Sequence, residues 1–180
     1  MKRRLVLASV VFVIVAVTIA AGFWAWSNEP SSPVERMLGG AQVVETIREP
    51  DRVEAYRLKP DTAYWGLAKI TISDFVATAG PIDVAPQIQA RLSNALLSPD
   101  SYWDGFKPCV PEYGVRLAFF RGTERVDVLF CFECDMLLVF HNDRVSGGED
   151  FDPARPVVVK AVKEVFPQDK AIQKLNAKSR

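Results

Sequence analysis

Apolar and polar residues alternate along two neighbouring segments in the second half of the chain. The apolar positions are Val115, Leu117 and Phe119 in the first segment and Val126, Val128, Phe130 and Phe132 in the second. Because successive side chains of a strand point to opposite faces, both segments predict strands with one buried face. Gly122 lies in the short connection between them, which predicts a hairpin.

Shorter patterns predict the other strands. Alternation indicates strands over 53–58 and 66–72, and residues 75–79 either extend the second of these or form another short strand. The pair Gly80-Pro81 then predicts a break. Apolar residues 137–140 predict a strand that pairs back after a turn near 133–136. Residues 141–144 and 146–150 are expected to be loops.

Apolar residues recur at steps of three and four over 84–98 and 153–166, which predicts two helices with one apolar face each. Tyr102, Trp103 and Phe106 follow the first of these, either as the lining of a pocket or as a lid over the core. Consecutive strands with helices before and after them predict an α+β fold, an antiparallel β-sheet with packed helices. Asp127 and Glu133 alternate with apolar residues, so the second face of the sheet is expected to be partly covered.

An uncharged run of 22 residues, Leu5 to Trp26, stands near the N-terminus. As a helix it would cover about 33 Å, enough to cross a bilayer. Lys2, Arg3 and Arg4 precede it, and positive charge stays on the cytoplasmic side. The pattern therefore predicts one N-terminal transmembrane helix over 5–26, a cytoplasmic tail over 1–4, and a protein that spans the inner membrane once with its C-terminal domain outside the cytoplasm.

A cleaved signal peptide is the alternative, because Thr18-Ile-Ala20 has small residues at cleavage-like spacing. Both interpretations export the rest of the chain. A linker and stalk helix are expected over 27–50, where Ser32, Pro33 and Glu35 resemble a capping box. Gly39-Gly40 interrupts that helix, so it forms either a stalk or two short pieces. The exported domain is expected over 51–180.

The chain carries 22 basic and 22 acidic side chains, a balance that argues against a nucleic-acid partner. The only partner predicted is the membrane, through Leu5 to Trp26. No catalytic or cofactor motif is recognisable, so neither catalytic residues nor a cofactor are predicted. Glu149, Asp150 and Asp152 lack the spacing of a calcium loop and predict a solvated acidic loop.

The three cysteines, Cys109, Cys131 and Cys134, allow four interpretations. The first is a disulfide from Cys109 to one of the other two, which an exported domain would retain. A hairpin centred near Thr123 places Cys131 opposite Val115 and Cys134 nearer to Cys109, although the segment around Cys109 could reach either.

The second interpretation is a metal site in which His141 joins the three sulfurs as a zinc ligand. The third is a redox dithiol, although residues three apart on a strand point to opposite faces. The fourth is a set of unpaired buried thiols.

The pattern from Cys109 through Cys131-Phe-Glu-Cys134 to Phe151-Asp-Pro resembles a group of uncharacterised bacterial envelope proteins, exported or lipid-anchored. This resemblance covers about 51–175 and implies a location and a shared cysteine arrangement, but no reaction. The expected function is a non-catalytic binding or structural module on a membrane anchor. The alternative is a thiol- or metal-dependent envelope enzyme that uses the three cysteines.

Overall fold

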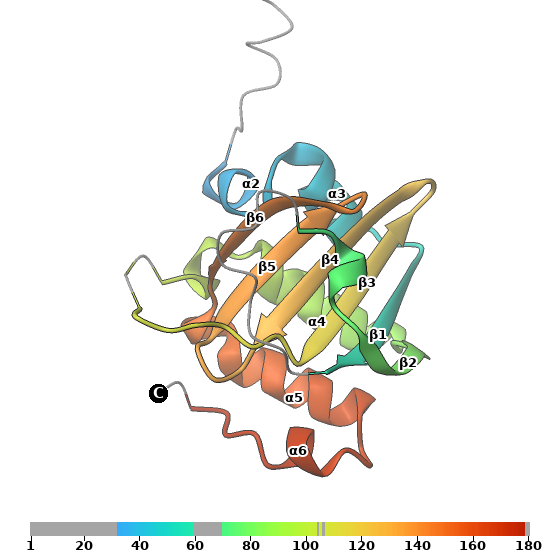
Figure 1. The fold of residues 1–180 in the computed structure, drawn as a ribbon. Helices are drawn as coiled ribbons and strands as arrows, with labels where there is room; N and C mark the ends of the chain where they lie inside the picture. The colour runs from blue at the N-terminus through green and yellow to red at the C-terminus, as the bar shows by residue number, and fades with distance from the viewer. Residues whose placement is uncertain (1–31, 60–69, 104, 106, 179–180) are drawn as a thin grey trace, which may run out of the picture. The chain divides into compact units, whose positions relative to one another are not determined.

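The computed structural model describes residues 32–59, 70–103, 105 and 107–178. Six strands form one antiparallel sheet in the order β2-β1-β3-β4-β5-β6 (Figure 1). The strands are β1 (Arg52–Leu58), β2 (Ala77–Asp83), β3 (Val115–Arg121), β4 (Glu124–Cys131), β5 (Met136–His141) and β6 (Arg144–Asp150). The helices are α2 (Pro33–Leu38), α3 (Ala41–Arg48), α4 (Pro86–Leu97), α5 (Arg155–Val165) and α6 (Lys170–Gln173). This arrangement confirms the predicted α+β class.

The predicted transmembrane helix over 5–26 lies outside the described residues. Among the residues that are described, no helix combines the length and the hydropathy that a membrane span requires.

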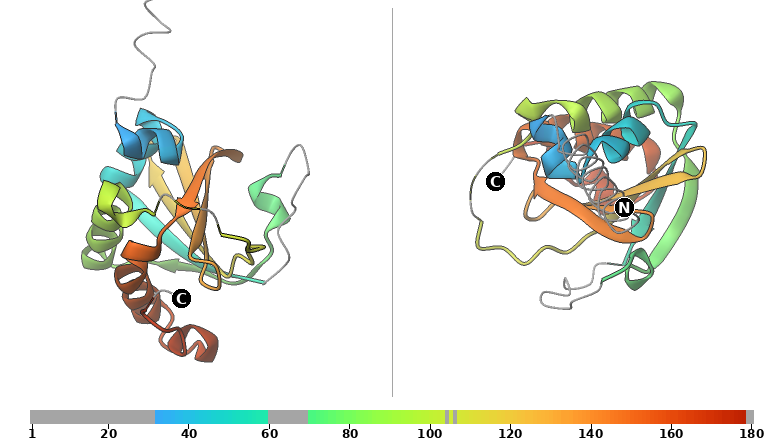
Figure 2. Two further views of the ribbon diagram at one scale, coloured as in Figure 1. Left: turned by 90° about the vertical axis from the view of Figure 1, so that its left-hand side faces the viewer. Right: turned by 90° about the horizontal axis from the view of Figure 1, so that it is seen from above.

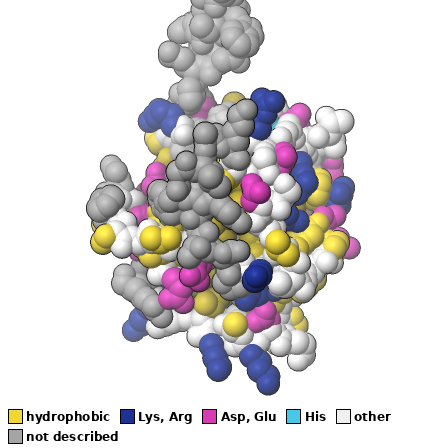
Figure 3. Space-filling model, in the orientation of Figure 1, with side chains coloured by type: hydrophobic (Ala, Val, Ile, Leu, Met, Phe, Trp, Pro, Cys, Tyr) yellow, Lys and Arg dark blue, Asp and Glu magenta, His cyan; other side chains and the backbone are white. Residues whose placement is uncertain are grey.

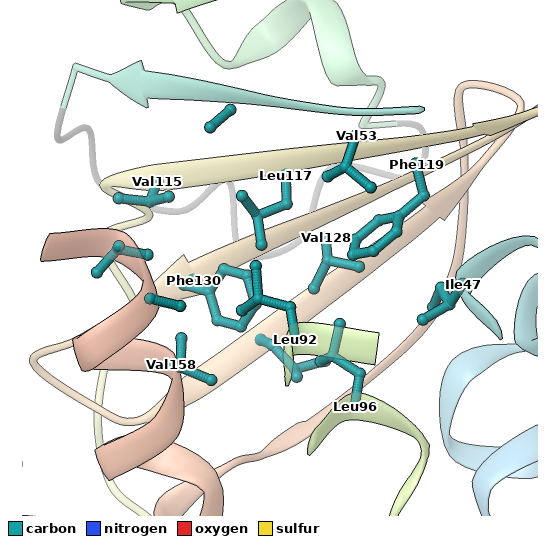
Figure 4. Close-up of a cluster of buried hydrophobic side chains, with 14 of the residues drawn as sticks. Ile47, Val53, Leu92, Leu96, Val115, Leu117, Phe119, Val128, Phe130 and Val158 are labelled. Carbon is teal, nitrogen blue, oxygen red and sulfur yellow. The ribbon is translucent and has the colours of Figure 1, made fainter. Parts of the chain in front are cut away.

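Helices cover one face of the sheet, which we call the helical face. Figure 2 shows the sheet nearly edge-on in its left-hand view, with α4 and α5 on one side and the short turn Ile72–Asp74 on the other. The alternating residues of β3 and β4 point into this helical layer, as predicted (Figure 4). The fully buried members are Val115, Leu117, Phe119, Val126, Val128 and Phe130.

The β3–β4 hairpin differs by one residue from its predicted register. Val115 pairs with Phe130, not with Cys131, and Arg121 pairs with Glu124. Two residues, Gly122 and Thr123, form the turn, and Gly122 has a φ of 56°. A two-residue turn centres the hairpin between these residues and keeps all the apolar positions on one face, because opposite residues share a face.

Residues 33–48 belong to the folded domain, which begins at Ser32 and therefore earlier than the expected boundary near Asp51. They form the two short helices α2 and α3, which are separated at Gly39 and Gly40. The Ser32 side chain caps α2 by accepting a hydrogen bond of 3.1 Å from the Glu35 amide. This region is not a free stalk, because both helices bury apolar residues in the domain. The buried residues are Val34, Leu38, Val43, Val44 and Ile47.

Two segments expected to be irregular are edge strands of the sheet. Gly80-Pro81 lies inside β2, where proline is tolerated because an edge strand has unpaired amide positions. Residues 146–150 lie inside β6 and are not a loop. A Cβ atom on Gly147 would lie 2.1 Å from the Met37 carbonyl oxygen, so this glycine permits the close approach of α2.

The strand predicted over 66–72 is not found where it can be checked. Residues 66–69 lie outside the described part of the chain, and Ile72–Asp74 is a single 3-10 turn. Thr71 and Asp74 hold this turn by a reciprocal capping arrangement, which competes with an extended conformation. The predicted helices at 84–98 and 153–166 are confirmed as α4 and α5.

Candidate functional site

The second face of the sheet, which we call the open face, carries a smaller apolar cluster. Its buried members are Leu58, Ile72, Tyr113, Leu129, Cys131, Cys134 and Phe140. Phe75 packs over this cluster, with its ring edge-on to Tyr113 at 5.7 Å and to Phe140 at 5.8 Å. Segments outside the sheet therefore cover part of the open face, as expected from its alternation of polar and apolar residues.

A disulfide joins Cys109 to Cys134, with their Cα atoms 6.0 Å apart. This is the pairing that the hairpin favoured, and it links the segment before β3 to the turn between β4 and β5. Closing a loop of 25 residues in sequence stabilises a fold by roughly 3 kcal/mol in the chain-entropy model. The bond thus holds the segment before β3, which carries Cys109 and Tyr113, against the open face.

Cys131 is a free thiol and is fully buried. Its sulfur accepts a hydrogen bond of 3.3 Å from the Glu112 amide. Burial raises the pKa of the Cys131 thiol, while backbone amides of Cys134 and Glu112 partly oppose this change. The thiol therefore remains protonated and poorly nucleophilic at neutral pH.

His141 does not join the cysteines. Its Nε2 lies 2.5 Å from a carboxylate oxygen of Glu124, and this hydrogen bond lowers the pKa of Glu124. His141 ends β5, whereas Met136 at its start pairs with Cys131, so the two positions are separated by roughly 16 Å of strand. The four predicted metal candidates do not converge, and no group of three metal-ligating side chains occurs in the described ranges.

The turn that carries Cys134 is anchored by a buried ion pair between Arg155 and Asp135. Arg155 also donates to the Phe132 carbonyl at 2.7 Å and to the Asn176 carbonyl at 2.8 Å. Both charged side chains are 3% exposed, so the pair is shielded from water. The sequence does not predict this pair, because Arg155 and Asp135 are 20 residues apart and no local pattern relates the two positions.

A second buried charge, Asp127, lies at the centre of the open face. Its carboxylate accepts a hydrogen bond of 2.9 Å from Arg125 and lies 3.6 Å from the Nε of Arg116. Burial raises the pKa of Asp127, although Arg125 and Arg116 act in the opposite direction. Arg116 in turn stacks 3.8 Å above the ring of Tyr56.

A cavity of about 330 Å³ opens beside the disulfide end of the open face. Its lining includes Lys107, Tyr113, Met136, Leu138, Gly148 and Asp150. Its volume lies at the low end of the range for small-molecule sites, and its walls combine apolar side chains with a few charged groups.

Asp150 in this cavity is 4% exposed, so it does not belong to a solvated acidic loop. One of its oxygens, Oδ2, lies 3.8 Å from Lys107 Nζ. The other, Oδ1, is buried without a hydrogen-bond partner in the described part of the chain. Burial raises the pKa of Asp150, and Asp152 and Glu149 raise it further, while Lys107 lowers it.

Lys107 is held in place by other groups. Its ammonium donates to the Cys134 carbonyl at 2.9 Å and pairs with Asp152. The ammonium also lies 5.4 Å from the ring of Trp103, which is 43% exposed. Tyr102, by contrast, packs against the hydrophobic core on the helical face, and its hydroxyl donates to the Leu96 carbonyl. For Tyr102, this supports the alternative in which the aromatic residue covers the core. Phe106 lies outside the described residues.

Comparison with known proteins adds nothing to this geometry, because no protein-family model, no curated protein and no solved structure matches the chain.

Proposed function

We propose that this protein is an extracytoplasmic domain held on the inner membrane by a single N-terminal helix over 5–26, and that it is a non-catalytic binding or structural module of the bacterial envelope. The Cys109–Cys134 disulfide carries the proposal. Disulfides persist in oxidising compartments and are rare in the cytosol. The uncharged run after Lys2-Arg-Arg4 supplies the route of export.

The state of the third cysteine supports a non-catalytic role. An enzyme that used the cysteines would need a reactive thiolate that a substrate can reach. Cys109 and Cys134 are joined to each other, and Cys131 is buried with a raised pKa. This arrangement favours a structural use of the sulfur atoms over the thiol-dependent alternative.

Two measurements test the proposal. A reporter that is active only outside the cytoplasm should be active when it is fused after Pro30, and activity of a cytoplasm-only reporter there would overturn the orientation. Full-length protein that is denatured in the presence of an alkylating agent should have one alkylated cysteine without reductant and three when the disulfide is reduced first. Three thiols without reductant would remove the observation on which the proposal rests.

A further inference from the structure

We propose that the end of the domain formed by α5 and α6 binds an acidic peptide segment of a partner protein, with an apolar side chain of that segment in a cavity beside α5. This inference rests on the binding role proposed above and names the class of partner for that role. We call this part of the domain the basic end. Its lysines are Lys160, Lys163, Lys170, Lys174 and Lys178.

Charge is distributed unevenly along the chain, although the basic and acidic side chains are equal in number. Residues 155–180 carry seven basic and two acidic side chains, whereas residues 32–154 carry 12 basic and 19 acidic side chains. An acidic remainder repels an anionic partner, and a basic segment attracts it. The distribution therefore directs an anionic partner to the basic end.

The lysines of the basic end form no ion pair in the described part of the chain, whereas arginines engage the carboxylates next to them. These ion pairs are Glu164 with Arg91, Asp169 with Arg57, and Asp135 with Arg155. Lys160 attracts Glu164 at longer range. Asp150 and Asp152 share Lys107 and precede α5, so they lie at the opposite end of that helix from Lys163.

One further carboxylate, that of Glu133, lies in the turn between β4 and β5. Arg155 links this turn to the C-terminal segment, because it donates to the carbonyls of Phe132 and Asn176. Five lysines therefore stand against a single carboxylate that the three arginines do not engage. This excess of ammonium groups leaves the basic end able to accept several carboxylates from a partner.

The type of cation favours carboxylates over phosphates. Arginine is preferred where phosphate groups or nucleic acids are bound, because its planar guanidinium matches two oxygens at once. The arginines next to the basic end already have carboxylate partners, and the unpaired cations in its described part are all lysines. The surface thus suits an acidic protein segment better than a nucleic acid.

A cavity of about 370 Å³ lies among these lysines. Its lining includes Pro156, Lys160, Lys163, Glu164, Gln173 and Ala177. Pro156 and Ala177 are exposed, so an incoming apolar side chain can reach them. The Gln173 amide donates to the Lys163 carbonyl at 2.9 Å and holds α6 beside the cavity. An apolar centre with a charged rim is the usual composition of a protein interface, which favours a peptide over a plain polyanion.

The attachment point of the proposed anchor is remote from the basic end. The described chain begins at Ser32, which caps α2, and Figures 1 and 2 place α2 and α6 at opposite ends of the domain. Figure 3 shows basic side chains protruding at the lower end of the domain, where α6 lies in Figure 1. This separation favours a partner in solution over the lipid of the anchoring membrane.

The test uses full-length protein in phosphatidylcholine nanodiscs and a peptide of sequence Glu-Glu-Leu-Glu-Glu, labelled with fluorescein at its N-terminus and amidated. The peptide should raise its fluorescence anisotropy saturably, and added salt should weaken binding. A peptide with glutamine for glutamate should not bind saturably, and one with serine for leucine should bind about tenfold more weakly. Absence of saturable binding by the acidic peptide, or equal binding by either control peptide, would overturn the proposal.

A double variant tests the lysines at the cavity. Lys160→Gln/Lys163→Gln should weaken peptide binding about tenfold, because each exposed charge pair contributes a factor of roughly three. Arg36→Gln/Arg144→Gln is the matched control. It removes two exposed charges that also form no ion pair in the described ranges, and it should change binding by less than about twofold. Equal losses for the two double variants would contradict the assignment.

Ala177→Glu tests the cavity without removing a lysine. It places a carboxylate beside the cavity at an exposed position, so it should abolish binding of the acidic peptide while the urea unfolding curve stays unchanged. This variant also keeps the proposal testable if the double lysine variant does not fold. Undiminished binding to folded Ala177→Glu would contradict the place of the peptide.

Competition distinguishes the class of partner. Unlabelled acidic peptide should displace the labelled peptide more effectively than sodium polyphosphate or phosphatidylglycerol vesicles do at equal negative charge. Stronger displacement by either competitor would overturn the peptide proposal in favour of a polyanion or a lipid surface. The reporter and thiol measurements do not involve the basic end. Failure of peptide binding therefore leaves the proposed location and disulfide role standing, and failure of those measurements leaves the basic end as a peptide site.

Discussion

On the helical face, β3 and β4 bury an unbroken set of apolar side chains against residues of the helices α2 to α6. On the open face, the same two strands bury Arg116 and Asp127 beside a smaller apolar cluster, and a disulfide fastens the segment that covers it. Figure 3 shows acidic and basic side chains interspersed on the part of the molecule that faces the viewer in Figure 1.

The difference shows how a sheet can be covered when only one face has enough apolar surface. The helical face gains its stability from burial of apolar area, which needs no specific partner. The open face has too few apolar residues for that, so a covalent bond and paired charges hold its cover. The stabilising contributions should therefore respond differently to substitution on the two faces.

The largest effect should follow truncation of Phe130 on the helical face. Phe130→Ala should lower the free energy of unfolding by about 3–5 kcal/mol in urea titrations, because the side chain is fully buried and leaves a cavity. Phe120→Ala is the matched control on the open face, where Arg52 lies over a partly exposed ring. Equal losses for the two variants would contradict the contrast between the faces.

Removal of the disulfide should have the next largest effect. The double variant Cys109→Ala/Cys134→Ala should lose about 3 kcal/mol of unfolding free energy, because its unfolded chain regains loop entropy. Cys131→Ala removes a thiol without opening a loop and should cost less. If instead Cys131→Ala costs more than the double variant, packing and not cross-linking holds the cover of the open face.

A smaller effect is expected for Ser93 on α4. Its hydroxyl donates a hydrogen bond of 2.6 Å to the Ile47 carbonyl and ties α4 to α3 within the helical layer. Ser93→Ala should cost about 1–2 kcal/mol in chemical denaturation, because the carbonyl loses its buried donor. The exposed Ser73→Ala should be close to neutral, and a similar loss there would mean that burial is not the cause.

The smallest expected effect is a change in pH dependence. Folded Asp127 has a raised pKa, so the folded state binds its proton more tightly than the unfolded state does. Its contribution to stability therefore falls as pH rises from the ordinary value of 3.8 towards the folded pKa. Urea titrations between about pH 4 and about pH 7 should show that Asp127→Asn removes this falling component.

Asp169 provides a control of opposite sign for that experiment. Burial acts to raise the pKa of Asp169, but hydrogen bonds from the Ile172 amide and from Arg57 outweigh it, and the pKa is lowered. Its contribution is present at higher pH and is lost as pH falls through the lowered pKa. Parallel pH profiles for the wild type and Asp127→Asn would contradict the direction assigned to Asp127.

Much of the helical face could be predicted from local patterns. Val115, Leu117 and Phe119 alternate with residues of the other face, and the apolar stripes of α4 and α5 recur at helical spacing. The candidate site could be predicted only in part. Cys109 and Cys134 were paired correctly, whereas Asp150 was expected in a solvated loop and proved to be 4% exposed.

The errors share a physical origin. Gly147 and Gly80-Pro81 have no local preference for a strand. Both nevertheless lie in edge strands, which form because they pair with the neighbouring strands β5 and β1. The predicted hairpin register was one residue off because the glycine at position 122 does not by itself fix the length of the turn.

By itself, the sequence determined strands β3 and β4, helices α4 and α5, the α+β class and the proximity of Cys109 to Cys134, because side-chain periodicity and short-range register are local properties. Tertiary structure alone decided that α2 docks beside Gly147, that Arg155 reaches Asp135, and that Asp150 lines a cavity. These features join positions far apart in the chain, and their energies depend on which groups exclude water from one another.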